Sequence, residues 1–184
     1  MIKLNLNETY KHHSVNEDLL NMTFHSPSID QSNTLMKVEL RPYPDSQFKD
    51  VYNLAFGPLN EKNKLDDTAK IKHADTDKMF STVLVFGLMF LQKYPGLKIG
   101  LDGSSDSRAY LYHRMFQTNR DHLNEYFVAL GVDWFVRLLR NGDVEREENG
   151  SAFFKPKPEF FNYERTPHDL YNYYIFYLRK AIIN

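Results

Sequence analysis

Cysteine is absent from this 184-residue chain. Without it there is no disulfide, no thiolate ligand for a metal ion and no cysteine nucleophile, a composition that suits a reducing compartment. An excess of charge of one sign is also missing, because 23 basic and 24 acidic side chains give a net charge of −1. This balance argues against a surface that coats nucleic acid, so any contact with nucleic acid must be local.

Long hydrophobic runs are missing as well. The most apolar stretch, residues 83–91 (VLVFGLMFL), is much shorter than the roughly 20 residues of a membrane-spanning helix. Residues 1–13 mix apolar and polar side chains and contain no apolar core of the kind found in signal peptides. We therefore expect a cytoplasmic protein that makes no contact with a membrane.

No complete catalytic motif occurs in the sequence. Ser104 and Ser105 lie in GSSDS (residues 103–107), which lacks the Gly-x-Ser-x-Gly elbow, and there is no phosphate-loop or dinucleotide fingerprint. His73, Asp75 and Asp77 have ligand-type side chains, but helix capping accounts for residues of this kind before a helix. We predict no cofactor and no bound metal ion, and the sequence favours a binding protein over an enzyme.

Hydrophobic residues make up 42% of the chain and aromatic residues 15%, which is enough for one globular core. We predict an N-terminal arm over residues 1–18, a single α+β domain over residues 19–155, and a C-terminal extension over residues 156–184. The expected fold is a mainly antiparallel sheet of about five strands, with two central helices packed on one face and an added C-terminal helix. Strands are expected near residues 19–26, 34–42, 51–57 and 97–101, and in the acidic hairpin after residue 140.

Capping residues and breakers mark the helices. Thr76 as N-cap and the Pro95-Gly96 stop predict the first central helix over residues 77–94. The second begins among residues 104–106 and ends near residue 120. Residues 122–140 fit either a helix or two strands, and we favour a short helix followed by strands.

The tail has the local signals of a helix start. Thr166, Pro167 and Asp169 match an N-cap, a proline in the first turn and an acid near the positive end of the helix dipole. They predict a tyrosine-rich helix that ends near residue 183.

The segment over residues 97–120 is the most informative part of the chain. A short apolar strand is interrupted at Gly103-Ser104-Ser105, and a basic, aromatic helix follows. Such a strand-turn-helix junction directs free backbone N–H groups and the positive end of the helix dipole toward a bound anion. It predicts a site for a phosphate-bearing ligand, a nucleotide or an RNA. The candidate ligand-binding residues are Gly103, Ser104, Ser105, Arg108, Tyr112, His113 and Arg114.

Two interpretations of Arg108 stay open. Helical spacing puts it on the same arc as Tyr112, so its guanidinium points inward. Because an unpaired buried charge is too costly, the guanidinium must meet either a ligand anion or an internal carboxylate. The internal partner would be Asp102 or an acid of the loop in the 60s.

The opposite arc of this helix contains His113, Arg114, Gln117 and Arg120. Arginines among aromatic rings can pair with phosphates and stack on bases, which suggests RNA or single-stranded DNA as a partner. A solvated helix face explains the same charges. A metal-independent nuclease that uses His113 and Arg114 is a further hypothesis.

A protein partner is the alternative to a small ligand. The rings between Tyr171 and Tyr177 are too many for one contact face of the predicted helix, and tyrosine is favoured at protein interfaces. They suggest a component of a toxin–antitoxin or phage-defence pair. Packing of these rings in the core is the other interpretation.

The segment GSSDSRAYLY, residues 103–112, resembles the signature Gly-Ser-Thr-x-Ala-Arg-Thr-Arg-Leu-Tyr of an uncharacterised Bacteroidetes family of unknown function. Residues 51–57 and 75–83 resemble the same family, and the resemblance spans roughly residues 20–155. Ser107 and Tyr110 replace the alanine and the second arginine of the signature, whereas Arg108 matches it. The family implies no activity, and its usual members are expected to lack the tail after residue 156.

Overall fold

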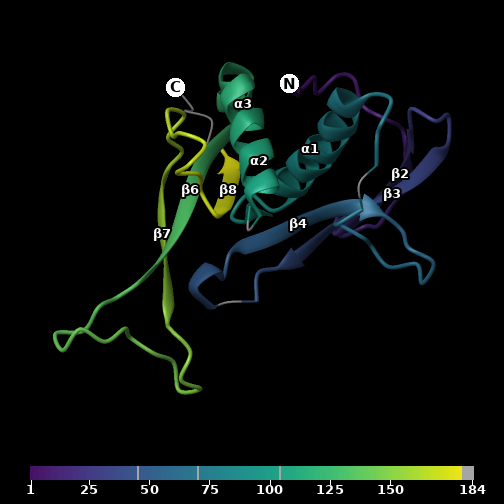
Figure 1. The fold of residues 1–184 in the computed structure, drawn as a ribbon. Helices are drawn as coiled ribbons and strands as arrows, with labels where there is room; N and C mark the ends of the chain where they lie inside the picture. The colour runs from purple at the N-terminus through teal and green to yellow at the C-terminus, as the bar shows by residue number, and fades with distance from the viewer. Residues whose placement is uncertain (45, 70, 104, 180–184) are drawn as a thin grey trace.

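The computed structural model describes residues 1–44, 46–69, 71–103 and 105–179. Over these residues, eight strands form one mixed sheet in the order β1-β2-β3-β4-β5-β8-β6-β7, together with three α-helices (Figure 1). Neighbouring strands are antiparallel except β4 and β5. The strands are β1 His12–Val15, β2 Asn21–Pro27, β3 Asn33–Pro42, β4 Val51–Pro58, β5 Lys98–Asp102, β6 Phe127–Val136, β7 Phe154–Phe160 and β8 Tyr173–Leu178. The helices are α1 Thr76–Lys93, α2 Asp106–Thr118 and α3 Arg120–Tyr126, and η1 Ser46–Phe48 is a 3₁₀ turn.

The expected sheet of about five strands with two central helices and an added C-terminal helix is wrong. The sheet has eight strands, and the tail supplies a strand, β8, in place of the expected tyrosine-rich helix. β8 lies between β5 and β6 and pairs with both. The segment expected as an extension therefore lies in the middle of the sheet.

The burial of β8 on both faces explains why a helix was expected where the structure has a strand. Tyr174 and Phe176 point to one face of the sheet, whereas Tyr173 and Ile175 point to the other, and all four are buried. A strand covered on both sides appears in the sequence as an unbroken apolar run, so the alternation that identifies a strand is hidden. The apparent helix start at Thr166 forms a turn, in which Asp169 N donates to Thr166 O at 3.0 Å.

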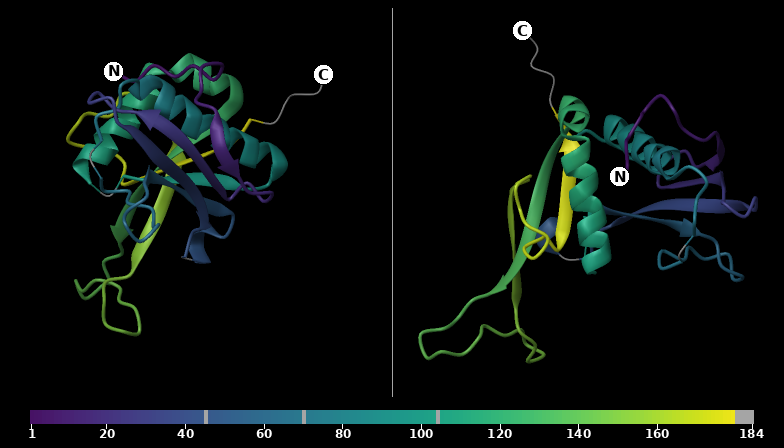
Figure 2. Two further views of the ribbon diagram at one scale, coloured as in Figure 1. Left: turned by 90° about the vertical axis from the view of Figure 1, so that its right-hand side faces the viewer. Right: turned by 45° about the horizontal axis from the view of Figure 1, so that its top comes forward.

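The sheet has a large core on one face and a small one on the other. α1 and α2 pack on the first face, against β4, β5 and β8. The second face has a small cluster beside η1, formed by Phe48, Val51, Val132, Tyr173 and Ile175. Figure 2 shows that the β2–β4 part of the sheet and the β6–β8 part run in different directions around the helices.

The central helices begin and end close to the predicted positions. Asp75, rather than Thr76, caps α1, and its side chain accepts from Lys78 N at 2.8 Å. Ser105 caps α2, as the sequence indicated. α3 followed by β6 confirms the short helix and strand favoured for residues 122–140. None of the helices in the described part of the chain has both the length and the apolar content to cross a bilayer.

The N-terminal segment is held on the helices. Leu4 N donates to Asn119 Oδ1 at 2.8 Å, Asn5 N to Ser81 Oγ at 2.9 Å, and Tyr10 N to Thr82 Oγ1 at 2.8 Å. Leu4 is buried in the main core. The expected arm over residues 1–18 thus contains a packed segment followed by the edge strand β1.

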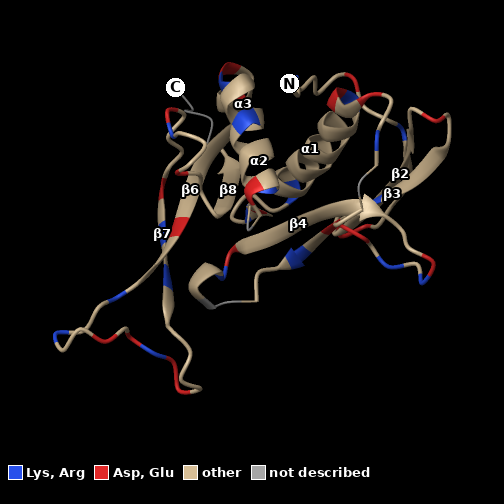
Figure 3. Cartoon of the chain, in the orientation of Figure 1, with Lys and Arg blue, Asp and Glu red and all other residues tan. Residues whose placement is uncertain are grey.

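A long hairpin arm leaves the body of the molecule at β6 and β7. Its outer part, residues 137–153, contains isolated bridges between Leu138 and Val144 and between Arg146 and Ala152, together with an ion pair between Arg137 and Glu145. Figure 3 shows both acidic and basic residues along this part. It is the exposed acidic hairpin that the sequence indicated.

Candidate ligand-binding cavity

A cavity of about 870 Å³ opens between β4, the N-terminal part of α1, the end of β5 and the first turns of α2. We call it the β4–α2 cavity. Its apolar wall consists of Met36, Leu54, Phe56, Ile71, Met79, Phe80 and Leu111. Polar side chains gather at the end nearest α2 and the loop in the 60s, namely Asp67, Thr68, Asp102, Ser105, Ser107, Arg108 and Tyr112.

Arg108 occupies the polar end of the β4–α2 cavity. Its Nη2 lies 2.8 Å from the backbone oxygen of Asp67 and 3.3 Å from Asp67 Oδ2, and its Nη1 lies 3.9 Å from Asp102 Oδ2. Its side chain is 28% exposed, whereas those of Asp67 and Asp102 are about half exposed. The internal partners expected for an inward arginine are both present, and the guanidinium still faces the cavity.

Local packing fixes the positions of Arg108 and Asp67 at the polar end of the cavity. Tyr174 of β8 donates its hydroxyl to Ala109 O at 2.8 Å and so ties the first turn of α2 to the sheet. On the opposite side, the backbone at Asp66 lies so close to Gly57 of β4 that a Cβ atom at Gly57 would overlap it. This close approach brings Asp67 to the rim of the cavity, where it meets Arg108.

Tyr112 supplies a polar atom inside the cavity. The residue is only 7% exposed, and burial raises the pKa of its phenol to about 12, against the opposing charge of Arg108. Among the described residues, its hydroxyl has no hydrogen-bond partner within the chain, unlike those of Tyr171, Tyr173 and Tyr174. The phenol is therefore protonated at neutral pH and is available to a ligand.

Asn53 and His73 line the far side of the cavity. Asn53 Oδ1 accepts a hydrogen bond from the Tyr173 hydroxyl, which leaves its amide N–H groups for other partners. His73 Nδ1 contacts Ser26 Oγ at 2.8 Å, and burial lowers the pKa of the imidazole. His73 is therefore neutral at physiological pH.

The structure brings together three of the predicted site residues and separates the others. Ser105, Arg108 and Tyr112 line the cavity. Gly103 is buried and its N–H donates to Asn172 O at 2.9 Å, so this N–H is not free for an anion. Ser104 lies outside the described residues.

His113 does not lie on an exposed polar arc, and that expectation is corrected. The residue is 3% exposed and its ring lies 5.1 Å from the ring of Phe161. Burial lowers the pKa of the imidazole, and the charges of Arg114 and Arg165 lower it further. Neither ring nitrogen has a hydrogen-bond partner among the described residues. Because the imidazole is buried, an attack on RNA by this ring would require α2 to open locally.

The arginines of the outer arc are engaged in contacts within the chain. Arg114 Nη1 donates to Gln117 Oε1 at 2.6 Å, and Gln117 in turn donates to Tyr163 O. The guanidinium of Arg120 lies over the Tyr163 ring, 4.5 Å from its centre. The outer face of α2 therefore offers less free positive charge than its sequence suggested.

The tyrosines expected on a protein-binding helix are buried in β8 and the segment before it. Tyr171 and Tyr174 are 0% exposed and Tyr173 is 3% exposed. These rings cannot form the contact surface that was predicted for Tyr171 to Tyr177, and core packing explains them.

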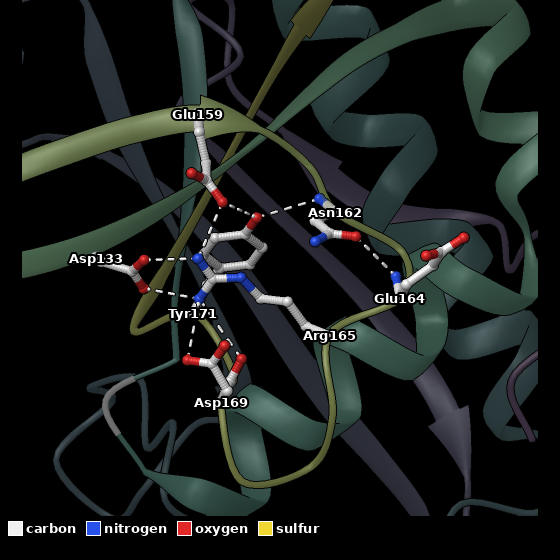
Figure 4. Close-up of polar contacts among 7 residues, drawn as sticks. All are labelled: Asp133, Glu159, Asn162, Glu164, Arg165, Asp169 and Tyr171. Atoms are coloured by element: carbon white, nitrogen blue, oxygen red, sulfur yellow. Dashed lines mark hydrogen bonds and ion pairs between the residues drawn. The ribbon is translucent and has the colours of Figure 1, made fainter.

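Tyr171 belongs to a polar cluster around Arg165, which holds the tail to the β6–β7 hairpin (Figure 4). Arg165 Nη2 lies 2.7 Å from Asp133 Oδ2 and 2.9 Å from Glu159 Oε1, and its guanidinium lies 3.6 Å from the centre of the Tyr171 ring. The Tyr171 hydroxyl donates to Glu159 Oε1 at 2.6 Å. The cluster is internally satisfied, which indicates a structural role.

Histidine and carboxylate side chains are the groups that a metal site in this cysteine-free chain would need. Over the residues that the structure describes, no group of three or more histidine, cysteine, aspartate or glutamate side chains is arranged to hold a metal ion. Asp75 is used as the cap of α1 and His73 contacts Ser26.

Sequence reasoning identified the α2 end of the cavity and missed its β4 wall. Arg108 and Tyr112 were found from helical spacing, and an acid of the 60s loop was expected near Arg108. Phe56 gave no signal, because an apolar strand residue that lines a cavity has the same sequence pattern as one that lines the core. Asn53 is a single polar residue in an apolar strand and belongs to no motif.

Comparisons with known proteins identify the family of the chain. No curated protein and no solved structure matches the chain. The sequence profile of DUF6934, a family of unknown function, matches residues 6–153. That match covers most of the chain, including the whole of the β4–α2 cavity, and the protein belongs to this family of unknown function.

Proposed function

We propose that the protein binds a phosphate-bearing small molecule, a nucleotide by class, in the β4–α2 cavity. The observation that carries the proposal is one cavity that combines an apolar wall with an arginine and the first turn of a helix. Its volume of about 870 Å³ falls within the usual range of small-molecule sites, about 300–1,000 Å³. A single nucleotide is therefore a better fit than a long RNA strand.

Each part of a nucleotide has a chemically matched group in the cavity. The guanidinium of Arg108 presents a planar fork that suits phosphate oxygens. The hydroxyls of Ser105 and Ser107, at the positive end of the α2 dipole, add donors. The rings of Phe56 and Phe80, whose centres are 5.4 Å apart, give an apolar surface for a base.

Binding of phosphate at Arg108 competes with Asp67. The carboxylates of Asp67 and Asp102 are about half exposed, so water can solvate them when the guanidinium turns toward a ligand. Exposed ion pairs contribute little stability, so this exchange is not prohibitive. Removal of the competing carboxylate by Asp67→Asn should therefore tighten phosphate binding, whereas Arg108→Ala should abolish it.

Thermal unfolding in the presence of inorganic phosphate, nucleoside mono- and triphosphates and short RNA oligomers tests the proposal. A ligand at a hundred times its Kd stabilises the folded state by about 2.7 kcal/mol. For a domain of this size that raises the Tm by roughly 5–10 °C. We expect a shift for the wild type, a larger one for Asp67→Asn at the same ligand concentration and none for Arg108→Ala. Arg120→Ala removes an arginine outside the cavity and serves as the matched control.

The same experiment separates a binding arginine from a structural one. If Arg108 only stabilises the fold, Arg108→Ala lowers the Tm without ligand, and no ligand shifts the wild type. Arg108→Lys keeps the charge but loses the fork, so it should fold and bind phosphate more weakly. Failure of every nucleotide, RNA and phosphate to shift the wild type would overturn the proposal.

We also infer a cytoplasmic location, which is supported by the cysteine-free composition. A Bacteroidetes distribution of the family is a second inference, supported by the resemblance of residues 103–112 to the signature given above. Cell fractionation and a census of the genomes that encode the family test the two inferences.

A further inference from the structure

The hydroxyl of Tyr112 is a buried hydrogen-bonding group that the fold does not use. The residue is 7% exposed and lines the β4–α2 cavity, and its ring packs 5.9 Å from the ring of Tyr174. Among the described residues nothing bonds the Tyr112 hydroxyl, whereas the Tyr174 hydroxyl donates to Ala109 O at 2.8 Å. Buried polar groups nearly always have a partner. A hydroxyl that lines a cavity without one therefore points to a partner that enters the cavity.

Tyr112 lies one helical turn after Arg108. Residues four apart share a face of a helix, and both of these side chains line the β4–α2 cavity. Burial is the main cause of the raised pKa of the phenol, and the charges of Arg108, Asp102 and Asp67 also act on it. The hydroxyl therefore belongs to the polar end of the cavity, together with the guanidinium.

The polar end of the cavity becomes less exposed from its rim to Tyr112. The side chains of Asp102 and Asp67 are 53% and 47% exposed, and that of Arg108 is 28% exposed. Tyr112 is more deeply buried than all three. A ligand that enters from solvent thus meets the carboxylates and the guanidinium first, and the Tyr112 hydroxyl is the innermost donor.

A phosphate at the end of a ligand differs from one inside a chain. The guanidinium fork of Arg108 can bind two phosphate oxygens. A terminal phosphate has a third free oxygen that can accept another hydrogen bond, whereas both free oxygens of a diester are already used by the fork. A diester also continues beyond the phosphate on both sides, so it does not fit a donor at the enclosed end of a cavity.

We propose that Tyr112 selects a terminal phosphate, because its hydroxyl donates to the third oxygen of a phosphate that Arg108 binds through the other two. This inference rests on the proposed function and narrows its ligand class to nucleotides with a free phosphate end. Cyclic nucleotides and the internal phosphates of RNA are disfavoured. The protonated phenol is neutral, so it donates to a phosphate dianion without repelling it.

Calorimetric titration with pairs of esters tests the selection. Each pair consists of the 5′-monophosphate and the 3′,5′-cyclic monophosphate of the same nucleoside, taken from adenosine, guanosine, cytidine and uridine. We expect the wild type to bind the 5′-monophosphate of its preferred nucleoside more tightly than the cyclic ester. Tyr112→Phe should weaken binding of that 5′-monophosphate roughly 10- to 100-fold, as expected for a lost hydrogen bond to a charged group. The Kd of the cyclic ester should stay the same.

Two controls show that the change acts on the ligand. Tyr112→Phe keeps the ring and removes a hydroxyl that has no partner among the described residues, so its Tm without ligand should equal that of the wild type. Tyr110→Phe is the matched control, because Tyr110 lies on the same helix but is 49% exposed and outside the lining of the β4–α2 cavity. This variant should bind both esters as the wild type does.

The outcomes separate this inference from the proposed function. If the wild type binds the cyclic ester as tightly as the 5′-monophosphate or more tightly, or if Tyr112→Phe binds the 5′-monophosphate like the wild type, selection by Tyr112 is wrong and the phosphate site at Arg108 still stands. A lower Tm of Tyr112→Phe without ligand would show that the hydroxyl stabilises the fold, which contradicts a free donor. A wild type that binds none of the esters overturns the proposed function, and this inference with it.

Discussion

Replacement of Arg165 with methionine is expected to lower the free energy of unfolding by about 2–3 kcal/mol. The side chain is 10% exposed and makes hydrogen bonds of 2.7 and 3.1 Å to the Asp133 carboxylate and 2.9 Å to Glu159. It also stacks on Tyr171, 3.6 Å from the ring centre. Methionine keeps the length of the apolar stem, so the change removes mainly the guanidinium contacts.

The size of the expected loss in stability follows from the solvent exposure of Asp133 and Glu159, the partners of Arg165. Loss of one partner from a fully buried ion pair costs about 3–5 kcal/mol, because the other charge stays buried and unpaired. The side chains of Asp133 and Glu159 are about a third exposed, so water solvates them once Arg165 is gone. The cost is therefore below the buried value and above the about 0–1 kcal/mol of an exposed pair.

Urea unfolding at neutral pH, followed by circular dichroism, measures the loss. For a chain of this length the predicted change lowers the Tm by roughly 5–10 °C. Arg137→Met is the matched control, because Arg137 pairs with Glu145 but is 59% exposed, and its midpoint should hardly move. Equal midpoints for the two variants would refute the inference that the tail is fastened through Arg165.

Three further predictions concern the packing of the tail. The pKa of His113 is lower in the folded state than its unfolded value of about 6.5. The stability that the neutral imidazole contributes is therefore full above pH 6.5 and is lost as the pH falls through the folded pKa. His113→Leu should flatten this decline in urea midpoints between about pH 8 and 5, and an unchanged slope would contradict the prediction. Gly131→Ala places a Cβ atom in the ring of Tyr171 and should destabilise the fold by about 1–3 kcal/mol. The control Gly96→Ala meets open space and should not destabilise it. Equal Tm values for the two variants would contradict the close contact. Deletion of residues 156–184 removes β8 from the middle of the sheet and should give an unfolded or insoluble chain; a soluble fragment with cooperative unfolding would show that β8 is dispensable.

The direction and partners of Arg108 were predictable from its own neighbourhood. Helical spacing turned it inward, and the cost of burying a charge required an acid nearby. Asp67 and Asp102 lie where that reasoning placed them. A role for Arg108 in ligand binding stays a prediction, because a salt bridge and a ligand clamp require the same side chain in the same place.

The position of His113 was predicted wrongly for a reason that lies outside its helix. The spacing of α2 alone indicated a polar outer arc. Phe161, which follows β7, folds back over that arc and covers the imidazole. A contact between segments so far apart in the chain leaves no signal in the helix itself.

The sequence by itself determined the local elements. Caps and breakers predicted α1 from a cap at Thr76 to the Pro95-Gly96 stop, one residue from the observed cap Asp75. They predicted the start of α2 among residues 104–106, and the observed cap is Ser105. The turn over residues 141–143 was predicted from Asn-Gly-Asp, and Gly142 there has φ +88°. These signals act between residues a few positions apart, so they do not depend on the rest of the fold.

Only the tertiary structure decided the place of the tail. The run over Tyr173–Leu178 fits a buried helix or a buried strand equally well, and the cap-like residues from Thr166 favoured the wrong one. Pairing with β5 and β6 satisfies the backbone of this run on both sides and buries its rings on both faces. That gain comes from strands distant in the chain, so it outweighs a local preference that the sequence displays more clearly.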